Sequence, residues 1–439
     1  MRGVNFSFIM DKQIIKTIII EKQNAITTYP VVKRDIEFDS KANYVLVGLR
    51  RSGKSYLLYY DIQSQINKCE KSKEDILYIN FEDERLFFEG ATELGEILDA
   101  YYELYPQRIP LIYLDEIQIV SGWEKFARRL ADAKYRVMIT GSNAKMLSRE
   151  IASSLGGRFV SKEISPFSFK EYLRYKGIEL RNNWLYDSSI CAIVSNGFDE
   201  YFYNGGIAEA FPLSDKREYL NSLYQKILVG DIVERNGIRN PRVFRLLVKK
   251  LADSVMQPSS ISRLHHIVCS SGDKISLSVL KDYLDYIEEA YLFFSIPNLA
   301  SSVTEQTTIQ KRYMVDNGLL NLFLLNGQTK LLENIVATEL NRRYRNTQEE
   351  TLLYYYNKNI EVDFCIPSEK CAIQVSYSLA DSNIYEREVG ALVAFLKKNP
   401  DYSATIITRD QQSRIEKNGY AIDVVPVWKW LCMNDNSLK

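Results

Sequence analysis

The sequence feature that most constrains the fold is a glycine-rich segment between two apolar runs. Residues 48–55 read GLRRSGKS, after the short apolar run at 44–47 and before a helix-forming run that extends to about residue 66. The pattern G-x-x-x-x-G-K-[ST] between a strand and a helix is typical of a loop that binds phosphate groups. Its glycines let successive N–H groups face the phosphates, and the helix N-terminus adds partial positive charge. We therefore predict a nucleotide site here.

The side chains of this loop have distinct expected roles. Lys54 would reach the β- and γ-phosphates, and the Ser55 hydroxyl would bind Mg²⁺. ATP and Mg²⁺ are therefore the predicted cofactors. The predicted nucleotide-binding residues are Gly48, Arg51, Ser52, Gly53, Lys54, Ser55 and Tyr56.

A second apolar run, residues 110–114, ends in Asp115 and Glu116. In phosphate-loop enzymes, an aspartate at the end of the neighbouring strand holds Mg²⁺. The glutamate beside it can orient or deprotonate the attacking water. We predict that Asp115 joins Ser55 as a metal ligand and that Glu116 is catalytic.

A third strand-like run, residues 135–141, ends in Ser142 and Asn143. Asn143, or Ser142, is placed to sense the γ-phosphate, and a helix N-cap at either residue is the alternative. With a further strand at 75–81, strands alternate with helical patterns, which predicts an α/β fold with a parallel sheet covered on both faces. The site would lie at the carboxyl ends of these strands.

Charge and cysteine usage narrow the class of protein. The 56 basic residues balance 56 acidic ones, so the whole chain shows no preference for nucleic acid or membranes. Six scattered cysteines and two adjacent histidines argue against a zinc site or a disulfide framework. No apolar run approaches the roughly 18 residues of a membrane span. We expect a cytoplasmic protein without membrane contact.

Several segments together resemble a known family. They are GLRRSGKS, LIYLDEIQ, MITGSNAKML, LGGRFVSKEISPFSFKEYL, YMVDNGLLN, LLENIVATEL and NIEVDFCI. Over nearly its whole length the chain resembles AAA-type ATPases of bacteria and archaea that carry a C-terminal domain of unknown function. The resemblance matches Lys54 and Ser55 to the Walker A residues, Asp115 and Glu116 to the Walker B pair, and Asn143 to the sensor.

Arg158, in LGGRF, matches an arginine of the family pattern. The resemblance allows a catalytic role at the γ-phosphate, and a structural ion pair is an equal alternative. Many ATPases of this type are hexamers that lend an arginine to a neighbouring subunit. A homo-oligomer is therefore allowed, although no residue here identifies itself as that arginine.

The predicted organisation has three parts. An AAA-type domain would span residues 1–200, a linker and winged-helix-like domain 201–310, and a restriction-endonuclease-like α/β domain 311–439. Gly205 and Gly206 are interpreted as part of the linker. Amphipathic patterns predict helices at 243–256 and 277–291, with a strand after the second. The family resemblance implies the winged helix and the endonuclease-like core.

The charges of residues 235–290 indicate whether this region would bind nucleic acid. The candidate recognition helix, residues 276–290, carries Lys281 against four acidic residues, Asp282, Asp285, Glu288 and Glu289. A helix that approaches a phosphate backbone should be basic, so protein contact or packing is favoured. The basic residues upstream (Arg235, Arg239, Arg242, Arg245, Lys249, Lys250) suit nucleic acid better, but a solvated helix face also explains them.

The endonuclease-like core implied by the resemblance needs carboxylates to gather a metal and a lysine beside them. Glu333 or Glu339 and Asp363 match the first two positions. Gln374 and Ser376 stand where the family has a carboxylate and a lysine. We therefore expect no nuclease activity and interpret Glu361 and Asp363 as residues that hold the fold.

These observations predict an ATP-binding and ATP-hydrolysing switch or motor that acts on an unknown protein partner. The alternative is an ATP-regulated DNA-binding or DNA-processing protein with a degenerate nuclease domain. A third reading is a nucleotide-binding module that does not turn over.

Overall fold

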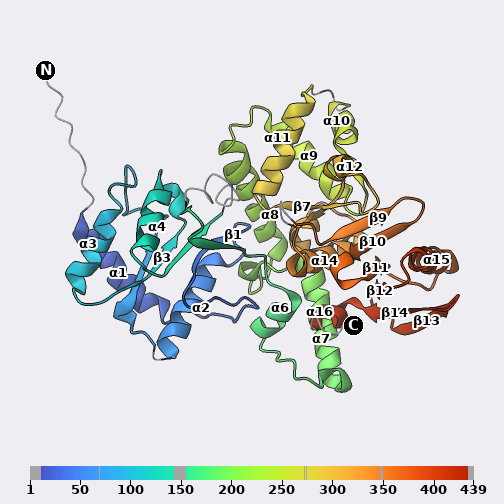
Figure 1. Ribbon diagram of the computed structural model, residues 1–439, viewed down its shortest axis with the longest axis horizontal. Coiled ribbons are helices and arrows are strands. Elements are labelled where there is room, and N and C mark those ends of the chain that lie inside the picture. Colours follow the sequence, from blue (N-terminus) through green and yellow to red (C-terminus); the bar gives the residue numbers. More distant parts are fainter. Residues whose placement is uncertain are drawn as a thin grey trace. The chain divides into compact units, whose positions relative to one another are not determined.

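The structure, a computed structural model, describes residues 11–68, 70–142, 155–270, 272, 274–346 and 350–433. It forms two compact units, one ending at Ile164 and the other beginning at Ser165 (Figure 1). The predicted three-domain division stays a prediction, although helix α7 (Ser188–Asn204) and strand β8 (Ile309–Met314) run through its limits. The α/β class is confirmed. In the described ranges no helix is both long and apolar enough to span a membrane.

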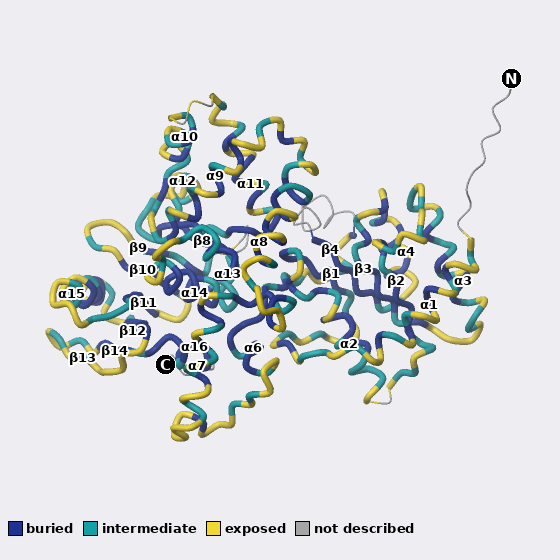
Figure 2. Tube along the Cα trace, turned by 180° about the vertical axis from the view of Figure 1, so that it is seen from behind, coloured by how far each residue is buried: buried dark blue, intermediate teal, exposed yellow. Residues whose placement is uncertain are grey.

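The first unit contains a five-stranded sheet, and every strand in it is parallel to its neighbours. The strands follow the order β2 (Ile76–Asn80), β3 (Leu111–Asp115), β4 (Val137–Gly141), β1 (Asn43–Val47) and β5 (Phe159–Glu163). The central strands are buried almost throughout (Figure 2). Such continuous apolar runs are characteristic of parallel strands covered on both faces. The predicted parallel sheet is therefore confirmed.

In the described part of the first unit, four α-helices accompany this sheet. They are α1 (Lys12–Ile26), α2 (Lys54–Asn67), α3 (Gly95–Leu104) and α4 (Trp123–Asp132), with short 3₁₀ turns at Lys73–Asp75 and Ile117–Ile119. Helix α2 packs Leu57, Leu58 and Ile62 into a core with Tyr78 and Tyr113 of the sheet. This packing holds α2, which follows the glycine-rich loop, against β2 and β3. Strand β3 ends in Asp115.

The second unit begins with helices and a small sheet. Its helices are α6 (Phe169–Tyr175), α7, α8 (Lys216–Lys226), a π-helix (Ile227–Glu234), α9 (Pro241–Asp253), α10 (Ile261–Cys269), α11 (Leu277–Glu289) and α12 (Val303–Thr308). Strands β6 (Ser259–Ser260), β8 and β7 (Phe293–Pro297) form an antiparallel sheet in that order. The helices predicted near 243–256 and 277–291 are present, and α10 was not predicted.

A six-stranded mixed sheet forms the rest of the second unit. Its order is β13 (Ser413–Lys417), β14 (Tyr420–Pro426), β12 (Ser403–Thr408), β11 (Cys371–Val375), β10 (Glu361–Ile366) and β9 (Tyr354–Asn357). The accompanying helices are α13 (Asn317–Leu320), α14 (Gln328–Arg343), α15 (Ser382–Lys398) and α16 (Val427–Cys432). Helix α15 joins the parallel strands β11 and β12 and packs Val389 and Leu392 into their core.

Gly205 and Gly206 are buried inside this second unit and do not form an exposed linker. A Cβ atom on Gly205 would lie 2.2 Å from the Asp316 carboxylate, and one on Gly206 would lie 2.1 Å from the Phe167 carbonyl oxygen. The Gly206 N–H donates to Asp316 over 2.7 Å. Here glycine permits close packing, which sequence alone does not distinguish from flexibility.

Candidate functional site

The loop after β1 has the shape that its sequence predicts. Gly48 has a φ of 141°, and a Cβ atom there would lie 2.3 Å from the Ile164 carbonyl oxygen. Gly53, with a φ of 94°, is the N-cap of α2. Arg51 is also left-handed, with a φ of 64°. These turns bring the loop directly onto the N-terminus of α2, where anions are favoured.

Lys54 lies inside this loop and is buried. Its ammonium donates to the carbonyl oxygens of Gly48 over 3.1 Å and Leu49 over 3.0 Å. Ser52 is also buried, and its carbonyl accepts a hydrogen bond from Arg34 over 3.1 Å. The lysine side chain therefore lies inside the loop and donates to the loop's own carbonyl oxygens, in the place where phosphate oxygens would bind.

Asp115 ends β3 and is almost completely buried. Its Oδ1 accepts from the Thr140 hydroxyl, and its Oδ2 accepts from the Tyr78 hydroxyl over 2.5 Å. The Ser55 side chain also hydrogen-bonds this carboxyl. Burial raises the pKa of Asp115, while the hydrogen bonds act to lower it. The structure therefore brings the two predicted metal ligands, Ser55 and Asp115, into contact.

Tyr78 and Thr140, which sequence analysis missed, hold the Asp115 carboxylate from both sides. The Tyr78 hydroxyl lies 3.1 Å from that of Tyr59 on α2, which completes a chain from α2 to Asp115. Burial raises the pKa of Tyr59 to about 12, so its hydroxyl stays neutral. The only signal in the sequence is one hydroxyl group within each of two short, mostly apolar strands.

Replacing Tyr78 by Phe removes one donor to Asp115 and preserves the ring. We expect a several-fold rise in the Mg²⁺ concentration that half-saturates ATP turnover, because Asp115 loses a fixed orientation. Titration of Mg²⁺ at saturating ATP measures this. Tyr101→Phe is the matched control, since the Tyr101 hydroxyl donates to the backbone carbonyl of Glu74. An unchanged Mg²⁺ requirement in Tyr78→Phe would contradict the role.

Glu116 follows Asp115 in a left-handed conformation, with a φ of 55°. Its N–H donates to the Thr140 hydroxyl over 3.0 Å, and its carboxylate accepts from the Gln118 amide. A left-handed glutamate is uncommon and needs such support. Gln118 was not anticipated from the sequence. Its neutral amide can orient the Glu116 carboxylate without neutralising it.

The other predicted residues lie in different settings. Tyr56 is 48% exposed, and its ring meets that of Tyr59 edge-on, with 5.4 Å between the ring centroids. Ser142 is buried directly after β4. Asn143 lies outside the described residues, so its sensor role stays a prediction.

Arg158 is not brought to this cluster. It directly precedes β5, and its carbonyl accepts from Asn43 at the start of β1. Its guanidinium pairs with Asp132 and donates to the Gly156 carbonyl. Because the strands are parallel, Arg158 lies at their amino ends, about 15 Å along the strands from the loop. The ion pair, one of the two alternatives, is present, and a γ-phosphate role stays a prediction.

Comparison with known proteins shows which family the chain belongs to. Residues 40–173 match the model of an AAA domain, and residues 195–330 match a domain of unknown function (DUF8612). The chain is 35% identical over 439 residues to the uncharacterized protein MJ1544 of Methanocaldococcus jannaschii, covering 97% of this chain and 96% of that protein. The chain belongs to the MJ1544 family. Its glycine-rich loop and acidic pair both lie within the AAA match.

Two further proteins are similar to this member of the MJ1544 family. An uncharacterized protein of Haemophilus influenzae is 29% identical over 397 residues, covering 88% of this chain and 93% of that protein. The Walker-type ATPase PABY2304 of Pyrococcus abyssi has 17% identity and a TM-score of 0.37, covering 74% of this chain and 98% of that one.

Proposed function

We propose that the first unit binds ATP with Mg²⁺ and hydrolyses it. The observation that carries this proposal is the convergence of Lys54, Ser55, Asp115 and Glu116 at the carboxyl ends of one parallel sheet. Ligands of open α/β sheets bind at this edge. The AAA match over residues 40–173 supports the same function.

Each of these residues has a defined task in the proposed reaction. Lys54 would leave the carbonyls of Gly48 and Leu49 and pair with the β- and γ-phosphates, beside the N-terminus of α2. Ser55 and Asp115 would hold Mg²⁺, which neutralises charge on the phosphate oxygens when bound. Glu116, oriented by Gln118, would take the proton of the attacking water.

We further propose that the nucleotide state is transmitted to a protein partner as a switch or motor. Thr140 touches both Asp115 and Glu116, so a change at the acidic pair reaches the end of β4. The segment after β4 contains the predicted sensor, Asn143. A cytoplasmic setting agrees with the free thiols of the described cysteines, Cys191, Cys269, Cys365, Cys371 and Cys432.

Lys54→Ala tests the nucleotide site directly. We expect the Kd for MgATP to rise at least ~10-fold, because a buried cation that would face the phosphates is lost. Equilibrium titration with a fluorescent ATP analogue, competed by ATP, measures the affinity. Lys41→Ala is the control, since Lys41 is exposed and lies before the start of β1. Equal affinity of Lys54→Ala and wild type would contradict the proposed site.

No observation favours the alternative DNA-processing function over this one. Helix α11 carries Asp282, Asp285, Glu288 and Glu289, and Glu288 is hydrogen-bonded by Ser295 within the unit. The order α9, β6, α10, α11, β7, β8, with the short helix α12 inserted between β7 and β8, supports the winged-helix proposal. Such a module also serves protein contacts, which agrees with the acidic helix.

A further inference from the structure

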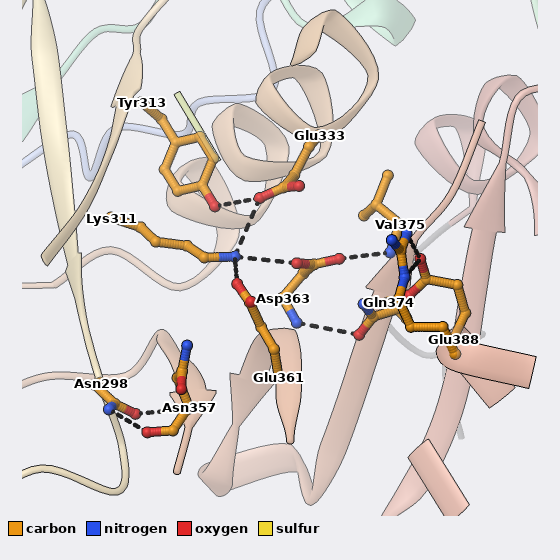
Figure 3. A network of polar contacts seen from close by, with 11 residues as sticks. Asn298, Lys311, Tyr313, Glu333, Asn357, Glu361, Asp363, Gln374, Val375 and Glu388 are labelled. Carbon is orange, nitrogen blue, oxygen red and sulfur yellow. Dashed lines mark hydrogen bonds and ion pairs between the residues drawn. The ribbon is translucent and has the colours of Figure 1, made fainter. Parts of the chain in front are cut away.

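The second unit contains a fully buried lysine surrounded by three carboxylates (Figure 3). Lys311 lies on β8, and its Nζ is 2.9 Å from Glu361 Oε1, 3.0 Å from Asp363 Oδ1 and 3.4 Å from Glu333 Oε1. Glu333 comes from α14, and the other two come from β10. The ammonium donates hydrogen bonds to Asp363 and Glu333, and it forms an ion pair with Glu361, whose side chain is 45% exposed.

Neighbouring groups give further hydrogen bonds to the carboxylates of this lysine cluster. The Tyr313 hydroxyl donates to Glu333 over 2.7 Å, and the Val375 N–H donates to Asp363 Oδ2 over 3.0 Å. A buried polar network is stable only when its members are paired in this way. The lysine is therefore one member of a larger buried network that also includes Tyr313 and the backbone of Val375.

Gln374 explains one departure from the endonuclease-like pattern. Its Oε1 accepts from the Asp363 N–H over 3.3 Å, and its Nε2 donates to Glu388 over 2.6 Å. The amide thus supplies an acceptor and a donor at these two positions without carrying charge. A glutamate there would set two carboxylates against each other, at Gln374 and Glu388.

A divalent cation does not fit these residues. The endonuclease-like prediction implies a metal among Glu333, Asp363 and a third carboxylate, but Lys311 Nζ lies between the first two and Gln374 stands at the third. Mg²⁺ requires oxygen ligands at about 2.0–2.1 Å in octahedral geometry, and an ammonium in the same space would repel it. In the described part of the chain, no three His, Cys, Asp or Glu side chains are arranged to hold a metal ion.

We infer that the Lys311 ammonium takes the place of a divalent cation and that the C-terminal core is held together by this internal charge. Lys311 links β8 of the small sheet to β10 of the large sheet and to α14. It therefore joins three elements, as a structural metal would. The cluster serves stability in the second unit, and it does not bind or cleave a phosphodiester through a metal.

The pKa shifts agree with this arrangement. Burial acts to lower the pKa of Lys311, but Glu333 and the other acidic groups raise it well above its usual value. Burial also raises the pKa of Glu333, to about 8, with Asp363 acting in the same direction and Lys311 against it. The positive charge of Lys311 thus offsets part of the negative charge that Glu333 and Asp363 place in the buried cluster.

The test measures the melting temperature of the full chain without nucleotide, with and without Mn²⁺. It compares Lys311→Met with the unchanged Lys311, both in a Ser55→Ala background. That background weakens Mn²⁺ binding at the loop of residues 48–55. We expect Lys311→Met to melt about 10 °C lower, because it leaves buried carboxylates unpaired. Millimolar Mn²⁺ should restore most of this loss, since the emptied position can then accept a cation. Wild type should show no Mn²⁺-dependent change in Tm.

Two further variants separate this effect from simple damage to the core. Lys311→Met/Glu333→Gln removes a carboxylate with the lysine, so its loss of Tm and its response to Mn²⁺ should both be smaller. Lys330→Met is the matched control, because Lys330 is a partly exposed lysine of α14 that pairs with Asp253. It should change Tm by no more than about 2 °C, as surface pairs contribute little.

If Lys311→Met does not fold with or without metal, Mn²⁺ binding by the wild-type protein tests whether the cluster holds a metal. Electron paramagnetic resonance of free Mn²⁺ measures this binding. Equal Mn²⁺ binding by wild type and Glu333→Gln supports the proposal. A bound Mn²⁺ that is lost in Glu333→Gln overturns it, because the cluster would then hold a metal despite the lysine. A Lys311→Met protein as stable as wild type without metal also overturns it.

Discussion

Glu116→Gln is expected to lower Mg²⁺-dependent ATP turnover by about 10²–10⁴-fold, the usual contribution of a general base. Its Kd for ATP should stay within about threefold of the wild-type value, because the side chain would face the attacking water and not the phosphates. Phosphate release at saturating ATP measures the first quantity, and equilibrium titration measures the second. The separation of turnover from binding is the characteristic result.

Glu84→Gln provides the matched control for this substitution. Glu84 is an exposed carboxylate of the first unit, in the segment after β2. It should retain wild-type turnover. If Glu116→Gln hydrolysed ATP at more than half the wild-type rate, Glu116 would not be the base. If turnover and affinity fell together, Glu116 would serve the loop's structure.

Asp316→Ala is expected to lower the free energy of unfolding of the second unit by about 3–5 kcal/mol. Asp316 is buried, and its carboxylate accepts from the N–H groups of Gly206, Gly318 and Leu319 at 2.7, 2.9 and 3.2 Å. Alanine would leave these three donors without the carboxylate. It would also leave a void where Gly205 packs against that side chain.

Urea denaturation in a Trp123→Phe background measures this effect. The remaining tryptophans, Trp184, Trp428 and Trp430, all lie in the second unit and report on its unfolding. Asp410→Ala is the control, since Asp410 is an exposed partner of Arg409. A loss of less than about 1 kcal/mol in Asp316→Ala would show that the carboxylate is not a main support of this region.

The first unit was the more predictable part because its signals are local. The loop at 48–55 specifies a strand, a turn and a helix within a short stretch, and the acidic pair ends its own strand. The parallel sheet then follows from alternating patterns. Gly48 belongs to the motif, but its close approach to Ile164 depends on the pairing of β1 with β5.

The supporting residues depend on contacts between distant segments. Tyr78 and Thr140 reach Asp115 from positions 37 and 25 residues away, and strand order cannot be deduced from their own sequence. Lys311 is likewise paired with Asp363, 52 residues along the chain. In sequence it is an ordinary lysine in a short strand. In our inference, its ammonium stands where the endonuclease-like pattern would place a metal ion.

The central claim is that this chain hydrolyses ATP at the loop of residues 48–55. Phosphate release from MgATP by the purified wild-type protein, beside Lys54→Ala and beside wild type in EDTA, tests it most directly. We predict turnover in wild type that is lost in both comparisons. Tight ATP binding by wild type without phosphate release, or equal release by Lys54→Ala, would contradict the claim.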